Sequence, residues 1–132
     1  LTIANRSEDR AAMLASSLHN AGFISLREDE LKRHIRDADI LINTTPVGMY
    51  PQADATLVNA GMMHPELVVF DIVYNPAETK LLREAKKAGV QTIIEGVKML
   101  VYQGAASFRI WTGMEPPMEV MESAVRKALS LS

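Results

Sequence analysis

The chain has 132 residues, 48% of them hydrophobic, which is enough for one domain with a buried core. Its formal net charge of −2 gives no polybasic surface, so we expect neither nucleic acid nor an anionic membrane as a partner. The absence of cysteine excludes a disulfide framework and a thiolate metal site, and it is the usage expected of a cytoplasmic protein. No apolar run approaches the roughly 18 residues of a membrane span.

The first half of the sequence alternates short apolar strands with helices. Ser7 is a good N-cap, and the acidic residues after it suit a first helical turn, where the dipole favours anions. Apolar residues recur at helical spacing up to Gly22, which we expect to end this helix. In the charged helix that follows, Leu31 and Ile35 should face inward. The predicted elements are a strand over residues 1–5, a helix from residue 7 toward residue 22, a short edge strand over 23–26, a helix over 27–38 and a strand over 38–44.

The second half continues this alternation. Apart from Asp71, residues 67–74 form a continuous apolar run, which is typical of a strand buried on both faces. Gly89 is expected to end the next helix, and Pro116 and Pro117 suit the start of the last one. The predicted elements are a loop with at most one helical turn over 52–65, strands over 67–74 and 90–94, and helices over 79–88, 97–111 and 117–129.

Strands that alternate with helices predict an α/β fold, in which helices cover both faces of a parallel sheet. Ligands of such sheets bind beyond the carboxyl ends of the strands. At one such end the strand breaks into the small residues of "INTTPVGMYP", where Thr45 and Gly48 would let a ligand approach the backbone. The alternative is an ordinary tight turn, which proline and glycine favour by themselves.

The segment "ANRSEDR" leaves the first strand with two arginines. Arg6 and Arg10 are four residues apart and flank a helix N-terminus, so both guanidinium groups lie near free backbone N–H groups. In dinucleotide-binding folds a carboxylate at this point binds the ribose of NAD, whereas arginine accommodates the 2′-phosphate of NADP. Here Asn5 replaces the acid. The alternative is an exposed helix start with solvated charges.

Three other positions could carry chemistry. Asp71 ends an apolar strand, where an aspartate more often caps a turn, so we favour a structural role over a catalytic one. The Tyr74 hydroxyl could meet a substrate, although a half-buried aromatic lid is the alternative. Gln103 could donate to and accept from a polyol, or face solvent. The three histidines share no metal-ligand spacing, so we expect no metal site.

Four segments, in this order, resemble the C-terminal, NADP-binding half of shikimate dehydrogenases. They are "NRSEDR", "INTTPVGMYP", "DIVYNPAETKLL" and "EGVKMLVYQGAASFRIWTG". The second and fourth are specific to that family. The first is similar to the Asn-Arg-Thr segment of glutamyl-tRNA reductases, which lack the Met-Leu-Val-x-Gln-Gly helix and therefore rank second.

The resemblance implies residue roles. The implied NADP contacts are Asn5, Arg6, Ser7 and Arg10 around the 2′-phosphate and ribose, Thr45 and Val47 along the cofactor path, and Ile72, Gly96 and Met99 beside the nicotinamide. The implied contacts to shikimate or 3-dehydroshikimate are Tyr74 and Gln103. The lysine and aspartate that handle the proton in this family lie in its N-terminal substrate domain, so no catalytic residue is expected in this chain.

The resemblance also implies that the fold is incomplete. It predicts a Rossmann-like doubly wound sheet without its first strand and glycine-rich phosphate loop. In the strand order 3-2-1-4-5-6 that strand is central, so its absence leaves two unpaired edges and a split core. We expect residues 1–113 to be a partial NADP-binding domain and residues 114–132 to form a helix that packs back on a missing N-terminal domain.

The function implied for the longer parent protein is the NADP-dependent exchange of 3-dehydroshikimate and shikimate in aromatic amino acid biosynthesis, by a monomer or homodimer. This segment alone is expected to be inactive. The alternative is a non-catalytic module that binds a dinucleotide. Quinate as the substrate and NAD as a secondary cofactor stay open within the family.

Overall fold

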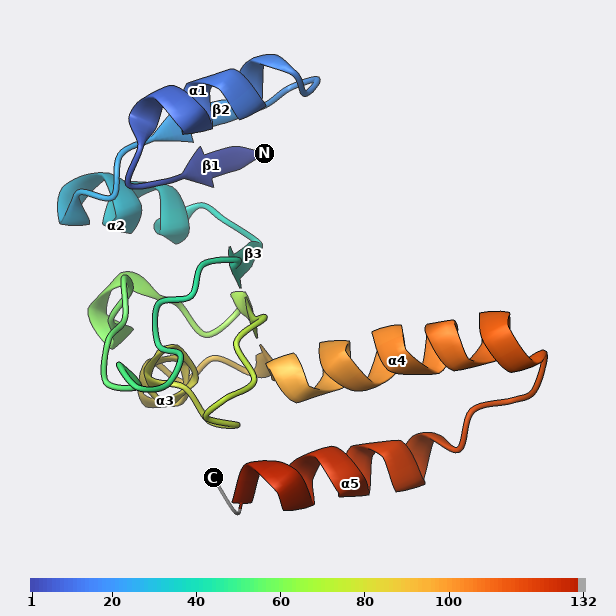
Figure 1. The fold of residues 1–132 in the computed structure, drawn as a ribbon. Coiled ribbons are helices and arrows are strands. Elements are labelled where there is room, and N and C mark those ends of the chain that lie inside the picture. Colours follow the sequence, from blue (N-terminus) through green and yellow to red (C-terminus); the bar gives the residue numbers. More distant parts are fainter. Residues whose placement is uncertain (131–132) are drawn as a thin grey trace.

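The structure of the chain, a computed structural model, describes residues 1–130 and consists of parallel strands connected by helices. Figure 1 shows a β1–α1–β2 unit at one end, β3, β4 and β5 in the middle, and two long helices projecting from them. The elements are β1 (Thr2–Ala4), α1 (Glu8–Ser16), β2 (Gly22–Ile24), α2 (Glu28–Arg36), β3 (Ile40–Asn43), the 3-10 helix η1 (Ala60–Met62), β4 (Val68–Asp71), α3 (Lys80–Lys87), β5 (Thr92–Ile94), α4 (Gly96–Thr112) and α5 (Met118–Ser130).

The strands form two separate parallel sheets, with the orders β1-β2 and β3-β4-β5. The predicted α/β class is therefore confirmed. Within the described residues β1 pairs only with β2, and β3 pairs only with β4, so both strands have a free edge. A groove of about 680 Å³ lies between them and is lined by Ala4 of β1 and Ile40 of β3. Such a break is what the strand order predicts when its central strand is missing.

The main core lies on one face of the β3-β4-β5 sheet. Leu67 and Val69 at β4 are fully buried, and α2, η1 and α3 cover them. Leu31 and Ile35 of α2 face this core, as the helical spacing predicts. The other face is open at β3, where Ile40 and Ile42 are 58% and 51% exposed.

Helix α1 is shorter than predicted, because it ends at Ser16 instead of continuing toward Gly22. Asn20 adopts a left-handed conformation with φ 57°, which asparagine tolerates, and this turns the chain into β2. Gly22 is the first residue of β2 and pairs with Thr2. Ser7 occupies the N-cap position, but its side chain makes no capping hydrogen bond.

Helices α4 and α5 form an antiparallel pair (Figure 1). Gly113 ends α4 in the left-handed conformation, with φ 69°, and its N–H donates to the Arg109 carbonyl. Arg126 of α5 donates to Glu95 and Glu122, and these hydrogen bonds raise the pKa of its guanidinium. The Arg126–Glu95 ion pair therefore holds α5 against the start of α4. No helix among the described residues is long and apolar enough to cross a membrane, and the cytoplasmic location stays a prediction.

Candidate functional site

The predicted binding residues lie where the strands end. Asn5 and Arg6 follow β1, Thr45 and Val47 follow β3, and Ile72 follows β4. Carboxyl ends of parallel strands meet at one edge of a sheet, which is where ligands of α/β folds bind. The topology thus gathers segments that are far apart in the sequence.

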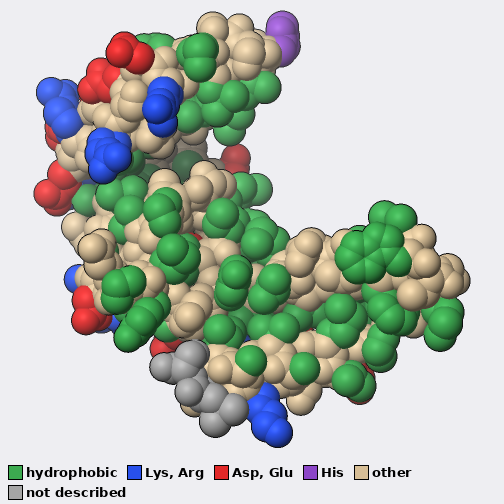
Figure 2. Space-filling view, in the orientation of Figure 1, with side chains coloured by type: hydrophobic (Ala, Val, Ile, Leu, Met, Phe, Trp, Pro, Cys, Tyr) green, Lys and Arg blue, Asp and Glu red, His purple; other side chains and the backbone are tan. Residues whose placement is uncertain are grey.

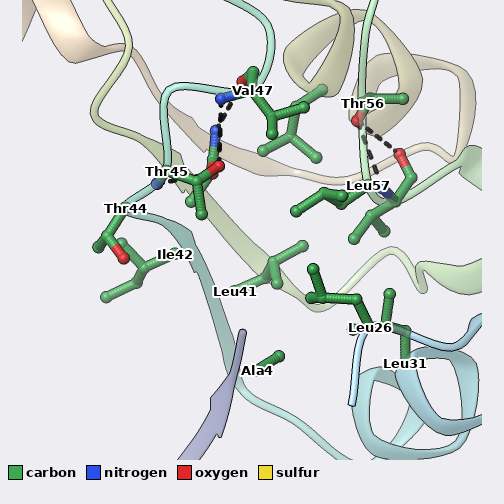
Figure 3. A pocket seen from close by; sticks show the side chains of 13 residues that line it. Ala4, Leu26, Leu31, Leu41, Ile42, Thr44, Thr45, Val47, Thr56 and Leu57 are labelled. Carbon is green, nitrogen blue, oxygen red and sulfur yellow. Dashed lines mark hydrogen bonds between the residues drawn. The ribbon is translucent and has the colours of Figure 1, made fainter. Parts of the chain in front are cut away.

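A pocket joins the end of β1 to the end of β3 (Figure 3). Thr45 and Val47 line one side of it, and Leu26 and Leu31 line the opposite side. Its wall is mostly apolar, and the pocket shares Ala4, Leu31 and Leu41 with the groove between β1 and β3. An apolar wall with a few hydroxyl and amide groups is typical of a ligand site.

The loop after β3 has a defined shape, because the Asn43 side chain is hydrogen-bonded at both ends. Its Oδ1 accepts from the Thr45 N–H at 3.1 Å and from the Thr45 hydroxyl at 2.7 Å. Its Nδ2 donates to the Val47 carbonyl at 3.2 Å and to Asp71 Oδ1 at 2.9 Å. The Val47 N–H in turn donates to the Thr45 hydroxyl at 3.2 Å. Internal bonds therefore hold the two predicted cofactor residues of this loop.

Asp71 is completely buried at the end of β4 and has a structural role, as we favoured from the sequence. Its Oδ1 accepts from the Val73 N–H at 3.0 Å, which turns the chain out of the strand. Its Oδ2 accepts from the Thr79 hydroxyl at 2.6 Å, and Thr79 caps helix α3. This turn is why β4 ends at Asp71, three residues before the predicted end of the strand.

Helix α4 begins directly against the chain that leaves β4. A Cβ atom on Gly96 would lie 2.5 Å from the Val73 carbonyl oxygen and 2.7 Å from that of Ile72. Only glycine permits this approach, because real Cβ contacts are essentially never below 3.0 Å. The first turn of α4, which carries the half-buried Met99, is thereby placed beside the loop that carries Tyr74.

The start of α1 presents unused polar groups. Within residues 1–130 neither Arg6 nor Arg10 forms an ion pair, and both side chains are exposed. The Ser7 side chain makes no capping hydrogen bond, and Asn5 is half-buried at the end of β1. Two free guanidinium groups beside a helix N-terminus form an arrangement that binds an anion, since the dipole and the N–H groups add to the arginine charges.

The predicted substrate residues are accessible to solvent. Tyr74 is 40% exposed just beyond β4. Gln103 is exposed about two turns along α4 from Gly96, and its Nε2 donates to the Leu100 carbonyl of the same helix at 3.2 Å. Among the described residues no group of His, Asp and Glu side chains could hold a metal ion.

Sequence reasoning favoured a structural role for Asp71 but missed the network to which it belongs. Asn43 and Asp71 are direct partners in the β3–β4 register, and Thr79 completes their network. A signal was present, because Asn43 and Asp71 each directly follow a run of apolar residues. Recognising it requires the register, which places residues 28 positions apart side by side.

Two family models match the chain. The model described as Shikimate / quinate 5-dehydrogenase matches residues 1–93, and that of the Shikimate 5′-dehydrogenase C-terminal domain matches residues 96–126. A shikimate dehydrogenase (NADP(+)) of Methanosarcina mazei is 53% identical over 133 residues, which cover 98% of this chain and 47% of that protein. The chain thus spans about half the length of the relatives it matches.

Solved structures agree with this likeness. A crystal structure of a shikimate dehydrogenase in complex with NADP+ superposes with a TM-score of 0.84 at 41% identity, covering 97% of this chain and 46% of that one. The Thermus thermophilus shikimate 5-dehydrogenase in complex with NADP(H) and shikimate gives a TM-score of 0.80 at 37% identity, with the same coverage of 97% and 46%.

Proposed function

The chain belongs to the shikimate and quinate dehydrogenase family, and from this premise we propose that it is the NADP-binding part of an enzyme that interconverts shikimate and 3-dehydroshikimate. In the oxidising direction the substrate loses a hydride to NADP+ and a proton to the enzyme or solvent. This reaction serves the synthesis of aromatic amino acids. The glutamyl-tRNA reductase alternative is set aside, because both matching family models are those of shikimate dehydrogenases.

One observation carries the choice of NADP. Arg6 and Arg10 have no ion-pair partner in the described part of the chain, and they flank the N-terminus of α1 next to Asn5 and Ser7. These groups fit a 2′-phosphate, which needs positive charge and N–H donors. Thr45 and Val47 would form the wall along the cofactor. The bound cofactor supplies the hydride chemistry, and the protein orients it.

The substrate contacts in this chain are proposed for Tyr74 and Gln103. The close approach at Gly96 supports this proposal, because it sets α4 against the loop that carries Tyr74. The Tyr74 hydroxyl and the Gln103 amide can each donate and accept hydrogen bonds, which suits the hydroxyl groups of shikimate. No residue of this chain is proposed to transfer the proton.

We propose that the remaining half of the enzyme completes both the sheet and the site. A parallel strand could pair with the free edges of β1 and β3, because the groove between them is open along Ile40. Hydrophobic side chains also lie along the outer part of α4 and α5 (Figure 2), including Trp111, which is 82% exposed. Residues 114–130 would then pack back on this half together with α4, and residues 1–113 would be the partial cofactor domain. The last two residues of the predicted segment 114–132 lie outside the described part of the chain.

The proposed function is tested with the full-length protein that contains these residues. We expect it to reduce NADP+ in the presence of shikimate, followed at the absorbance of NADPH, and the 132-residue chain alone to show no turnover. Binding of NADP without turnover by the full-length protein would instead support the non-catalytic module. Quinate and NAD are run in parallel to define the substrate and the cofactor.

Limited proteolysis should show how far the chain depends on its other half. We expect the isolated chain to be cleaved early between β2 and β3, because the β1–α1–β2 unit is not hydrogen-bonded to the other sheet. The same peptide bonds between β2 and β3 should resist the protease in the full-length protein under identical conditions. Equal resistance of the two proteins would contradict the proposed completion of the sheet.

A further inference from the structure

The carboxylate of Asp71 connects three segments around the site. Asp71 is 0% exposed, and it accepts from Asn43 at the end of β3, from Val73 after β4 and from Thr79 at the start of α3. All three neighbours act as donors, as an ionised carboxylate requires, because it can only accept. No buried side-chain nitrogen or oxygen lacks a partner in residues 1–130, so the network is complete.

This carboxylate orients the Asn43 amide together with the Val47 carbonyl and the Thr45 N–H. Asn43 Nδ2 lies 2.9 Å from Asp71 Oδ1, so the amide oxygen must point the other way, toward Thr45. There it accepts from both the N–H and the hydroxyl of Thr45. A reversed amide would place an oxygen against the carboxylate and two hydrogens against the Thr45 donors, which costs several hydrogen bonds at once.

The orientation of Asn43 then sets the path of the loop. The Thr45 hydroxyl, whose hydrogen is directed to Asn43, accepts from the Val47 N–H, and the Val47 carbonyl accepts from Asn43 Nδ2. Asn43 therefore connects Asp71 directly to both Thr45 and Val47, and the bond between Val47 and Thr45 closes the loop. The Thr79 bond is separate, because it reaches the other carboxylate oxygen and leads to α3.

We propose that Asp71 is a positioning residue for the cofactor: acting through Asn43, it holds Thr45 and Val47 in the shape that receives NADP. The inference rests on the proposed function, and it assigns a role in cofactor binding to a buried side chain that does not line the pocket between β1 and β3. Asp71 acts on the loop through its hydrogen bond with Asn43, whereas its hydrogen bond with Thr79 contributes only to stability.

The test separates the two paths in the full-length protein. Asn43→Leu removes the link to the loop, and we expect the Kd for NADP to rise about tenfold, the effect of one or two lost hydrogen bonds. Thr79→Val is the matched control, because it breaks the bond to the same carboxylate on the α3 side. It should lower the midpoint of thermal unfolding and leave the Kd for NADP within about twofold.

Two substitutions at Asp71 of similar shape test the acceptor itself. Asp71→Leu should weaken NADP about as much as Asn43→Leu, and the double variant should be no weaker than Asp71→Leu alone, because both changes break one path. Asp71→Asn can keep an oxygen toward Asn43 and turn its amide nitrogen to the Thr79 hydroxyl, so it should recover most of the affinity. If Asp71→Leu fails to fold, the comparison of NADP affinity between Asn43→Leu and Thr79→Val decides the test.

Calorimetric titration with NADP, alongside thermal unfolding, gives the deciding outcomes. Unchanged NADP affinity in Asn43→Leu would overturn the inference, and so would an equal loss in Thr79→Val, since the effect would then follow stability. If the unsubstituted full-length protein itself binds no NADP, the proposed function fails. If only the positioning role is wrong, the unsubstituted protein still binds NADP.

Discussion

Replacing Arg6 by alanine should weaken NADP binding about ten- to a hundredfold and leave NAD binding almost unchanged. The guanidinium of Arg6 is exposed and unpaired within residues 1–130, so it can be directed entirely to a ligand. A hydrogen bond to a charged group contributes roughly 1.5–3 kcal/mol, which corresponds to about that range in Kd. NAD lacks the 2′-phosphate, so its affinity should change little when Arg6 is replaced. The measurement is the Kd of the full-length protein for both cofactors.

The matched control for Arg6→Ala is Arg83→Ala. Arg83 is a half-buried arginine that lies on α3 and pairs with Asp54. Its removal should change neither Kd, since exposed ion pairs contribute little to stability and this one lies outside the proposed site. Equal losses of NADP and NAD affinity in Arg6→Ala would show that Arg6 does not bind the 2′-phosphate.

Replacing Gly96 by alanine should destabilise the protein by about 2–3 kcal/mol and also impair substrate binding. The added Cβ would lie 2.5 Å from the Val73 carbonyl oxygen, so α4 must move away from the loop after β4. Backbone atoms cannot yield as a flexible side chain can, which makes this overlap costly. The same movement would shift Gln103 relative to Tyr74 and raise the KM for shikimate in the full-length protein.

Gly104→Ala is the control within the same helix. Its Cβ would meet only the Met121 Cε atom at 3.3 Å, and a methionine end can shift. Alanine also has the higher helix propensity, by about 1 kcal/mol, so Gly104→Ala should be neutral or slightly stabilising. Urea unfolding measures both variants. Similar stabilities for Gly96→Ala and Gly104→Ala would contradict the proposed close contact at Gly96.

The regular elements were predictable because their signals are local. Helical spacing placed Leu31 and Ile35 in the core, and every described strand overlaps a predicted one, although β4 ends three residues before its predicted end. The extent of α1 was not predictable in this way, because Asn20 turns the chain by its own backbone conformation. Nothing in the helical spacing before Gly22 indicates that turn.

The candidate site, like the fold, was only partly predictable from the sequence. The resemblance supplied the residues around Arg6 and Thr45, and their roles stay predictions until they are measured. The network that joins Asn43, Asp71 and Thr79, the residues that shape the site, came from the structure alone. Each is unremarkable in its own segment, since an asparagine, an aspartate or a threonine is common at the end of a strand or the start of a helix.

The sequence by itself determined the alternation of strands and helices, the family and the segments that carry the proposed cofactor and substrate contacts. These follow from residue spacing and from motifs, which need no knowledge of distant contacts. The tertiary structure decided that Asn43 pairs with Asp71 and that Gly96 must be glycine. Those features depend on the register between strands and on the approach of a helix to a loop, so they exist only once residues that are distant along the chain are packed together.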